Sequence, residues 1–293
     1  MRLLCYQDDD GPRVGVRLAD GVAPTRFTRL LDVIEGGAVA LDSVRSDAAT
    51  ATLIEPGTVL APLRPPKMFS SGINFLSHMD EEPGATVQQE QYFFSKLPSA
   101  VVGPGAPIVL PHRDMDVDYE VELAVVIGTP ARNVGRADAL AHVFGYTVTN
   151  DISSRAIQFR DAQVTLGKNA DTFAPLGPEI VLADEIPDPA ALHIEARVNG
   201  ELRQSESIAN MIWEVTSSIA WLSTIITLEP GDILSLGTPR GCGTFMEPPQ
   251  WLAPGDVVTV SERTIGELTN PVVAGPAYQT PWPDVRSRFS NRL

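Results

Sequence analysis

Acidic and apolar side chains alternate from Asp118 to Leu123 of this chain, immediately before the apolar residues 124–127. This pattern predicts a β-strand that enters a hydrophobic core. Because side chains two positions apart on a strand point to the same face, Glu120 and Glu122 should lie side by side, with Asp118 in line. Two carboxylates at the edge of an apolar strand repel each other unless a cation or a proton lies between them.

An oxygen-only pair of this kind suits a hard divalent cation such as Mg²⁺, Mn²⁺ or Ca²⁺. A further carboxylate, Asp151, follows a predicted strand over residues 144–149 and lies next to a loop. A carboxylate in that position is well placed to be a third ligand. The alternative for Glu120 and Glu122 is a solvated strand face without a metal.

A histidine and a glutamate three positions apart, His78 and Glu81, lie in a segment whose residues 76–82 are predicted to be helical. On a helix these two side chains share a face and are within hydrogen-bonding reach. A carboxylate beside an imidazole raises its basicity and fixes its tautomer, as a general base requires. The alternative is a surface pair in a mobile segment, since Pro83 and the polar residues 88–91 indicate a flexible flap.

Short strands must position these residues. Strands are predicted over residues 68–71, 92–96, 194–198, 201–204, 231–239 and 255–260, besides those already described. Asn199-Gly200 predicts a hairpin turn. Residues 211–226 are the best helix candidate, apolar on nearly every side and therefore expected to be buried. Shorter helices are predicted at 28–34 and 138–142.

The chain divides into a small N-terminal unit, residues 1–62, and a main domain, residues 63–293. The N-terminal unit is predicted to be α+β, with strands over 2–6 and 14–18, and it carries no evident chemistry. The candidate residues all belong to the main domain. Within it, Gly167-Lys168 is not a phosphate-binding loop, because the spaced upstream glycine and the following hydroxyl are both missing.

Composition excludes several classes of protein. The chain of 293 residues has 22 basic and 37 acidic residues, a net charge of −15, which disfavours nucleic acid and anionic membranes as partners. It has only two cysteines, too few for a disulfide framework. The N-terminal sequence runs at once into Asp8-Asp9-Asp10 and is not typical of a signal peptide. Without an apolar stretch long enough for a membrane span, a soluble cytoplasmic protein is expected.

From residue 67 to residue 273 the chain resembles the fumarylacetoacetate hydrolase family, in its shorter branch of acylpyruvases and related bacterial enzymes. The motifs that carry the resemblance are Gly72-Ile73-Asn74-Phe75 with His78 and Glu81, Phe94 with Lys96, Asp118 to Leu123, Gly145-Tyr146, Asn150-Asp151, Arg155 with Gln158, Gly167-Lys168, Asp171-Thr172-Phe173, Val198-Asn199-Gly200, Asn210-Met211-Ile212, Gly231-Asp232, Gly237-Thr238-Pro239 and Gly266 to Val272. Each motif is weak alone, but their shared order over some two hundred residues is specific.

The resemblance implies roles for individual residues. Glu120, Glu122 and Asp151 match carboxylates that bind Mg²⁺ or Mn²⁺, and sometimes Ca²⁺. His78 and Glu81 match a dyad that activates water, and Lys168 matches a lysine beside the metal. Lys96, Arg155, Gln158 and Thr238 match substrate-contacting positions. Two departures stand out, since Phe75 replaces a common tyrosine and Asn169-Ala170 replaces a frequent serine-phenylalanine.

The family fold implied is mixed but mainly β, a curled β-sandwich roll with few helices, and its members are usually homodimers. The implied activity is metal-dependent hydrolysis of a C–C bond in a 2,4-dioxo acid, such as an acylpyruvate or fumarylpyruvate, releasing a 2-oxo acid. The alternative is a lyase or isomerase of the same family, such as an oxaloacetate decarboxylase, a 2-hydroxydienoate isomerase or a keto-deoxy sugar acid dehydratase. A further alternative is a protein that is not an enzyme and uses the same metal-stabilised fold for binding. The lid residues 79–92 and the loop 240–250 are expected to set specificity.

Overall fold

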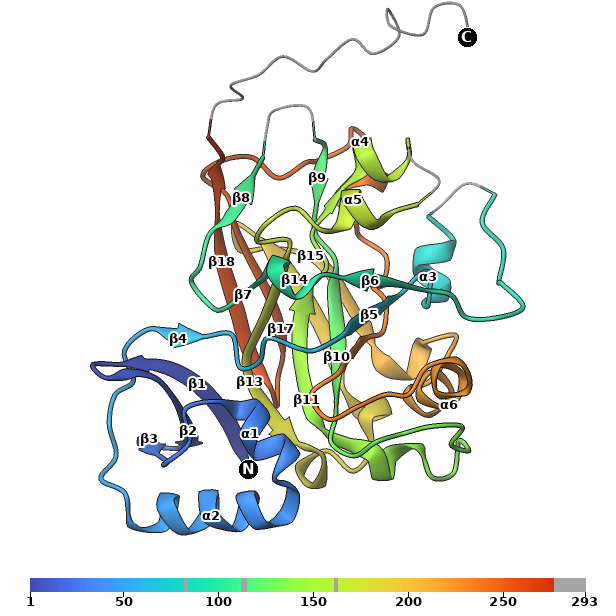
Figure 1. Ribbon diagram of the computed structural model, residues 1–293. Helices are drawn as coiled ribbons and strands as arrows, with labels where there is room; N and C mark the ends of the chain where they lie inside the picture. The colour runs from blue at the N-terminus through green and yellow to red at the C-terminus, as the bar shows by residue number, and fades with distance from the viewer. Residues whose placement is uncertain (82–83, 112–114, 161–162, 277–293) are drawn as a thin grey trace, which may run out of the picture.

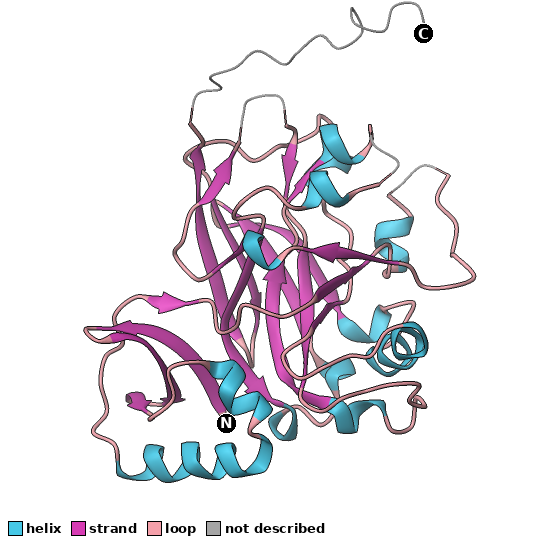
Figure 2. Ribbon diagram, viewed as in Figure 1, coloured by secondary structure: helices cyan, strands magenta, loops and turns pink. Residues whose placement is uncertain are grey.

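A computed structural model of the protein describes residues 1–81, 84–111, 115–160 and 163–276. The described part is mainly β, with eighteen strands and six α-helices. Figure 2 shows the strands at the centre of the molecule and most of the helices at its edges. The mainly β, mixed α+β class predicted from the sequence is confirmed.

Eleven strands form the larger sheet, in the order β3-β2-β1-β13-β11-β10-β16-β5-β6, with β4 paired to β1 and β7 paired to β13. Their bounds are β1 Arg2–Asp8, β2 Gly11–Leu18, β3 Gly21–Pro24, β4 Val59–Leu60, β5 Met68–Ser71, β6 Phe93–Lys96, β7 Val101–Val102, β10 Val121–Ile127, β11 Val143–Asn150, β13 Ala174–Leu182 and β16 Ile233–Ser235. The strands that carry the acidic residues, β10 and β11, are antiparallel neighbours inside this sheet (Figure 1).

A second sheet of five strands has the order β15-β14-β17-β18-β8, and β9 pairs with β12 separately. The bounds are β8 Ile108–Leu110, β9 Val117–Asp118, β12 Ser153–Ser154, β14 His193–Val198, β15 Glu201–Ser207, β17 Val257–Glu262 and β18 Gly266–Ala274. The predicted hairpin between β14 and β15 is confirmed. Its turn residues Asn199 and Gly200 have φ angles of 53° and 82°, the left-handed conformation that this dipeptide favours.

The main hydrophobic core is shared by the two large sheets. Val125 and Val148 of the larger sheet belong to the same buried cluster as Val258 and Leu268 of the five-stranded sheet. All seven residues of β10 are buried, as the apolar run in the sequence predicts. Burial of each valine or leucine side chain stabilises the folded state by about 1.5–3 kcal/mol. The packing of β10 therefore fixes the position of Glu122, which this strand carries.

The helices are α1 Leu30–Glu35, α2 Gly37–Thr50, α3 Leu76–Met79, α4 Arg155–Gln158, α5 Thr165–Lys168 and α6 Val215–Ile225. Helix α1 confirms the prediction at 28–34, and α3 lies inside the segment predicted at 76–82, whose residue 82 is outside the described residues. The segment predicted at 138–142 forms a 3₁₀ turn over Ala139–His142. None of the described helices is long and apolar enough to cross a membrane.

Two predictions about helices are wrong. Helix α6 begins at Val215 rather than at residue 211, because Met211 pairs with Phe75 in an isolated β-bridge. Its burial is also one-sided, since Ile225 is 61% exposed. The longest helix, α2, was not predicted, and its weak pattern explains why. Within α2 only Ala40 and Val44 are buried, so the sequence shows almost no apolar stripe.

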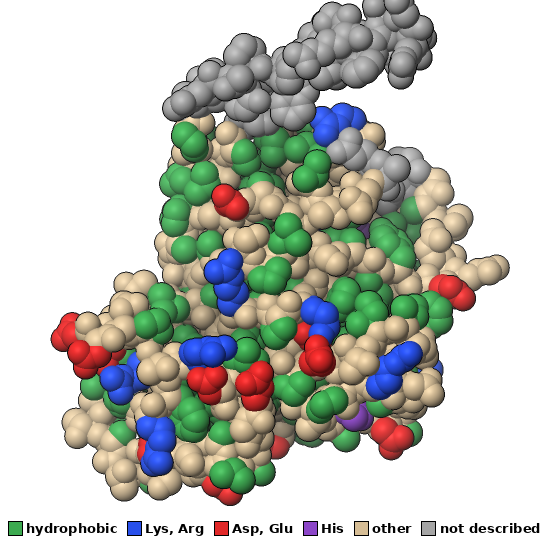
Figure 3. All heavy atoms as spheres, viewed as in Figure 1, with side chains coloured by type: hydrophobic (Ala, Val, Ile, Leu, Met, Phe, Trp, Pro, Cys, Tyr) green, Lys and Arg blue, Asp and Glu red, His purple; other side chains and the backbone are tan. Residues whose placement is uncertain are grey.

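The N-terminal unit is attached to the larger sheet. Strand β1 pairs antiparallel with β13 through the registers Arg2↔Val181 and Leu3↔Ile180. Figure 1 shows the unit, in blue, at one end of the long central strands. The boundary at residue 62 stays a prediction, and residues 277–293 of the predicted main domain lie outside the described residues. On the face drawn in Figure 3, basic side chains lie among acidic and apolar ones.

Candidate active site

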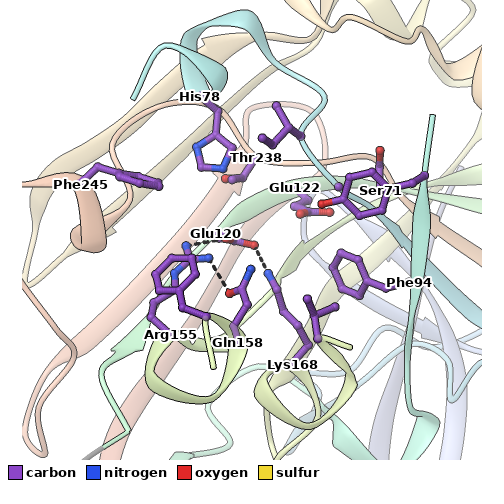
Figure 4. A pocket seen from close by; sticks show the side chains of 15 residues that line it. Ser71, His78, Phe94, Glu120, Glu122, Arg155, Gln158, Lys168, Thr238 and Phe245 are labelled. Carbon is purple, nitrogen blue, oxygen red and sulfur yellow. Dashed lines mark hydrogen bonds and ion pairs between the residues drawn. The ribbon is translucent and has the colours of Figure 1, made fainter. Parts of the chain in front are cut away.

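A polar pocket of about 220 Å³ lies where β10 begins. Residues from both ends of the main domain meet there, among them Ser71, His78, Phe94, Glu120, Glu122, Arg155, Gln158, Lys168, Thr238 and Phe245 (Figure 4). Small-molecule pockets usually have volumes of about 300–1,000 Å³, so this one suits a metabolite of few heavy atoms. It collects most of the candidate residues that the sequence singled out.

Three carboxylates converge beside this pocket, and two of them, Glu120 and Glu122, line it. Glu120 immediately precedes β10, Glu122 lies in β10, and Asp151 follows β11. The strand register brings them together, because the Asp151 N–H donates to the Glu120 carbonyl at 2.9 Å. One oxygen from each side chain lies within 4.8 Å of the others, and all three side chains are buried. The predicted neighbourhood of Glu120, Glu122 and Asp151 is therefore present.

Buried cations partly neutralise this cluster. The Lys168 ammonium bridges Glu120 at 2.6 Å and Asp151 at 2.9 Å, and Arg155 contacts Glu120 at 2.6 Å. Burial acts to raise the pKa of Glu120, but the charges of Arg155 and Lys168 outweigh it and hold that pKa well below its usual range. Glu120 is therefore an anion in the folded protein.

Glu122 has no ion-pair partner among the described residues. Its carboxylate accepts hydrogen bonds from the Ser235 hydroxyl and from the Gly237 N–H, the latter at 3.0 Å. Burial, followed by the charges of Asp151 and Glu120, raises the pKa of Glu122 to about 8. A buried carboxylate whose charge is disfavoured in this way either takes up a proton or needs a cation beside it.

The side chains present fit a divalent metal ion. The set is made only of oxygen donors, it is buried, and its least compensated member, Glu122, faces the other two. Lys168 alone cannot satisfy it, since its ammonium contacts Glu120 and Asp151 but forms no ion pair with Glu122. Hard divalent ions prefer such all-oxygen sets.

Lys96 does not occupy the predicted substrate-contacting position. Its side chain is fully buried, and its ammonium pairs with Asp151 at 2.7 Å. The same ammonium donates to the carbonyls of Ile152, Lys168 and Phe173. Lys96 is not among the residues that line the pocket. It lies behind the carboxylates and fixes Asp151 and the backbone of Lys168, which is a positioning role.

His78 and Glu81 are close, as their spacing predicts. The His78 Nδ1 atom lies 3.5 Å from a Glu81 oxygen, and His78 lines the pocket while Glu81 does not. Both oxygens of Glu81 accept from the Gly241 N–H, at 2.9 and 3.0 Å, so the carboxylate is held in place. The Phe245 ring packs edge-on against His78, with the ring centroids 5.7 Å apart. Figure 4 shows the imidazole above Glu120, between Phe245 and Thr238.

Arg155, Gln158 and Thr238 line the same pocket, as expected of substrate contacts. Arg155 begins α4, and its Nη1 donates to the Gln158 side-chain oxygen at 2.9 Å. Because that oxygen is used, the amide nitrogen is the end of Gln158 that can donate to a ligand. The Thr238 hydroxyl accepts from the Gln204 amide at 2.8 Å, which orients it.

The sequence places Asp118 in line with Glu120 and Glu122 but assigns it no role, and the structure shows what it contacts. Its carboxylate is fully buried and accepts from the N–H groups of Gly243 and Thr244, at 2.8 and 3.1 Å. It also pairs with Arg155, at 3.0 Å through Nε and 2.9 Å through Nη2. Asp118 therefore ties a pocket arginine to the loop that carries Phe245. Its place in the alternating acidic run was the available signal.

Two further residues near the pocket were also missed. The Cys242 Sγ atom lies 3.9 Å from His78 Nδ1, and burial raises the pKa of this thiol well above its usual range. It is therefore not a thiolate nucleophile. Gln91 donates to the Ser71 hydroxyl at 2.9 Å and so attaches the segment after α3 to the pocket wall. Residues 82–83 of the predicted lid lie outside the described residues, and its mobility stays a prediction.

Comparison with known proteins places the chain in a family. Residues 67–273 match the family model described as the C-terminal domain of fumarylacetoacetate hydrolase. The mitochondrial oxaloacetate tautomerase of Xenopus laevis is 39% identical over 289 residues, covering 93% of this chain and 90% of that protein.

Two solved structures share the fold. The fumarylacetoacetate hydrolase of the psychrophilic Exiguobacterium antarcticum is 38% identical with a TM-score of 0.84, covering 94% of this chain and 99% of that one. A maleylpyruvate hydrolase from Sphingobium, solved with manganese(II) and pyruvate, is 30% identical with a TM-score of 0.78, covering 94% of this chain and all of that one. The resemblance read from the sequence motifs is confirmed, and this chain belongs to the fumarylacetoacetate hydrolase family.

Proposed function

We propose that this protein is a divalent-metal-dependent enzyme that interconverts the enol and keto forms of a small 2-oxo dicarboxylic acid such as oxaloacetate. The observation that carries the proposal is that one imidazole and two carboxylates, Glu120 and Glu122, line the same small pocket, with a third carboxylate, Asp151, within 4.8 Å of those two. The oxaloacetate tautomerase from Xenopus, similar over nearly the whole chain, supports this reaction over others of the family.

Glu120, Glu122 and Asp151 would hold Mg²⁺ or Mn²⁺, with Ca²⁺ as a further oxygen-preferring ion. When bound, such an ion supplies Lewis acidity that polarises a keto oxygen and stabilises negative charge on it. Manganese in the Sphingobium relative supports a metal of this class. Lys96 and Lys168 keep the Asp151 carboxylate in position for the ion.

His78 is the group we assign to proton transfer. Tautomerisation moves one proton between a carbon and an oxygen, so a single base that accepts it and gives it back is sufficient. Glu81, 3.5 Å from Nδ1, would keep the other ring nitrogen available toward the pocket and stabilise the imidazolium while the proton is held. Phe245 limits rotation of the ring.

Arg155, Gln158 and Lys168 would bind and orient the substrate. Arg155 and Lys168 bring positive charge to a pocket that must accept a dianion, although both already contact Glu120. The Lys168 ammonium is the better placed to donate to a developing oxyanion, because it lies beside both Glu120 and Asp151. Thr238 offers a hydroxyl at the opposite wall.

Hydrolysis of a C–C bond in a 2,4-dioxo acid is the second candidate. The His78–Glu81 pair could activate a water molecule, and the Sphingobium relative is a maleylpyruvate hydrolase. The two reactions do not differ in the size of substrate they need, because oxaloacetate and acetylpyruvate have the same number of heavy atoms. The similarity to the Xenopus oxaloacetate tautomerase over nearly the whole chain is what puts tautomerisation first.

The test follows both reactions in parallel. Enol oxaloacetate is mixed with enzyme and Mg²⁺ or Mn²⁺, its enol absorbance is recorded, and pyruvate is measured in the same sample. We expect the enol to convert faster than in buffer, with little pyruvate, and EDTA to abolish the acceleration. A higher kcat/KM for pyruvate release from an acylpyruvate would move hydrolysis to first place.

The oligomeric state and the cellular compartment of the protein are part of the same proposal. We expect a homodimer, which light scattering of the purified chain measures directly. A cytoplasmic or otherwise reducing compartment is supported by the two buried free thiols, Cys5 and Cys242.

A further inference from the structure

A second group of metal-ligand atoms lies next to the three carboxylates. His78, Glu120 and Cys242 each offer one ligand atom, and these atoms lie within 4.8 Å of one another with all three residues buried. The Cys242 Sγ atom is 3.9 Å from His78 Nδ1. The proposed reaction uses His78 and Glu120, but it gives no role to the thiol.

The donor types differ from those of the carboxylate site. Nitrogen, oxygen and sulfur together suit a borderline or soft ion such as Zn²⁺ or Cd²⁺, whereas Mg²⁺ and Mn²⁺ prefer oxygen alone. Zinc bonds to nitrogen and sulfur are about 2.0–2.3 Å long, so tetrahedral ligation separates those two atoms by about 3.5 Å. The separation of 3.9 Å between Nδ1 and Sγ is close to this distance before any ion is bound.

The loop that presents the thiol is anchored on both sides of Cys242. The Gly241 N–H donates to Glu81, and the Gly243 N–H donates to Asp118 at 2.8 Å. Neither glycine tolerates a side chain, since an added Cβ would come within 2.0 Å of a backbone oxygen, Arg203 in one case and Gln250 in the other. The thiol is therefore held in one place beside the imidazole.

We propose that His78, Cys242 and Glu120 form an inhibitory binding site for a zinc-class ion. Binding displaces the thiol proton to solvent and forms a bond from the ion to the sulfur. It also takes the lone pair of His78 Nδ1 and displaces the contact of that atom with Glu81. The imidazole proton then stays on the other ring nitrogen, which can no longer accept the substrate's proton. Since Glu120 belongs to both sets, the ion also competes with Mg²⁺ or Mn²⁺ for that carboxylate.

The site can be tested without measuring activity, so the test does not depend on the proposed reaction. Cd²⁺ bound to a thiolate gives an ultraviolet charge-transfer band, and the chain has only two cysteines. Cys5 is the matched control, because it is also buried but donates to the Pro62 carbonyl in the N-terminal unit. Parent, Cys5→Ser and Cys242→Ser proteins are titrated with Cd²⁺ in excess Mg²⁺.

The parent and Cys5→Ser should show the band, and Cys242→Ser should not. Glu122→Gln should keep the band, because it alters only the oxygen site. If Cys242→Ser does not fold, His78→Asn tests the same binding site. The affinity of this variant for Cd²⁺ should be at least about tenfold lower than that of the parent, because the nitrogen ligand is lost. No band in the parent, or a band that survives in Cys242→Ser, would overturn the proposal.

An inhibition assay gives the second readout. In the parent, Zn²⁺ should inhibit enol conversion in the presence of saturating Mg²⁺, and Cys242→Ala should require at least about tenfold more Zn²⁺ for half-inhibition, relative to its own uninhibited rate. Equal Zn²⁺ sensitivity in the parent and in Cys242→Ala would place the inhibitory ion elsewhere.

Discussion

Asp118 and Arg155 form a buried ion pair, in which one carboxylate oxygen accepts a hydrogen bond from Nε at 3.0 Å and lies 2.9 Å from Nη2. The same carboxylate accepts from the N–H groups of Gly243 and Thr244, at the base of the loop that carries Phe245. A single side chain thus connects the pocket arginine with the aromatic ring that packs against His78. The roles proposed for Arg155 in substrate binding and for His78 as the base are therefore linked through Asp118.

Replacing Asp118 with Asn tests this connection. The substitution keeps the shape of the side chain but removes the charge that holds Arg155, and it leaves a buried guanidinium with less compensation. We expect KM to rise and kcat to fall together, and amide exchange in residues 241–245 to become faster. Glu81→Gln is the contrasting variant, because it alters the same loop at Gly241 and the partner of His78. It does not touch Arg155, so it should lower kcat and leave KM unchanged. A change in kcat alone in Asp118→Asn would contradict the proposed link to substrate binding.

The ion pair between Lys96 and Asp151 carries a prediction about stability. Both side chains are buried, and the lysine also donates to three backbone carbonyls. Breaking a buried pair by removing one partner typically costs about 3–5 kcal/mol. Lys96→Met should therefore lower the free energy of unfolding by about that amount, as measured by urea denaturation with EDTA present.

Lys67 provides the control for that measurement. It pairs with Glu229 and Asp232, but its side chain is 30% exposed. Lys67→Met should cost less than Lys96→Met, because its ammonium reaches solvent. The buried Asp232 carboxylate also keeps its hydrogen bonds from the N–H groups of Lys67 and Glu229. If the two substitutions destabilise equally, the buried environment of Lys96 is not the reason for its effect.

Metal binding should be visible in thermal unfolding. An ion present at 100 times its dissociation constant stabilises a folded protein by about 2.7 kcal/mol. Mg²⁺ or Mn²⁺ should therefore raise the melting temperature of the parent by several degrees, and EDTA should reverse the rise. In Glu122→Gln the metal should have little effect. With EDTA present and the pH above about 8, where Glu122 is charged despite its raised pKa, this variant should melt above the parent temperature, because one of three converging negative charges is gone.

The strand period made much of the site predictable. Glu120 and Glu122 are two residues apart, and a period of two places them together whatever the rest of the fold does. Asp151 could be placed because it follows an apolar strand, and His78 with Glu81 because three residues make nearly one helical turn. The resemblance to a family added Lys168, Arg155, Gln158 and Thr238, which the chain alone could not bring to one pocket.

Other features of the site depend on contacts between residues far apart in the sequence, which no local sequence pattern indicates. Lys96 ends a short strand, and nothing near it in sequence shows that its ammonium is buried behind Asp151. Cys242 reaches His78 across 164 positions of sequence, and Asp118 reaches Gly243 across 125. Helix α2 was missed because only Ala40 and Val44 of its residues are buried, which leaves no periodic signal.

The last prediction separates the candidate reactions through His78. Enol–keto conversion and C–C hydrolysis both need a base, whereas loss of CO₂ from oxaloacetate needs only a group that accepts the electrons of the broken bond. His78→Ala should slow the base-dependent reactions about 10²–10⁴-fold, the usual contribution of a positioned general base. Decarboxylation by the same variant should fall much less, because Glu120, Glu122 and Asp151 are unchanged.

Glu122→Ala is the companion variant, and it should abolish enol conversion and decarboxylation alike, since both need the same electrophile at the carboxylates. The comparison is decisive because the two substitutions affect different parts of one pocket. If the rate of enol conversion by His78→Ala is within a few-fold of the parent rate, His78 is not the base. Lys168 could not replace it, because burial acts to lower the pKa of its ammonium, but the charges of Asp151 and Glu120 outweigh burial and hold that pKa above its usual range.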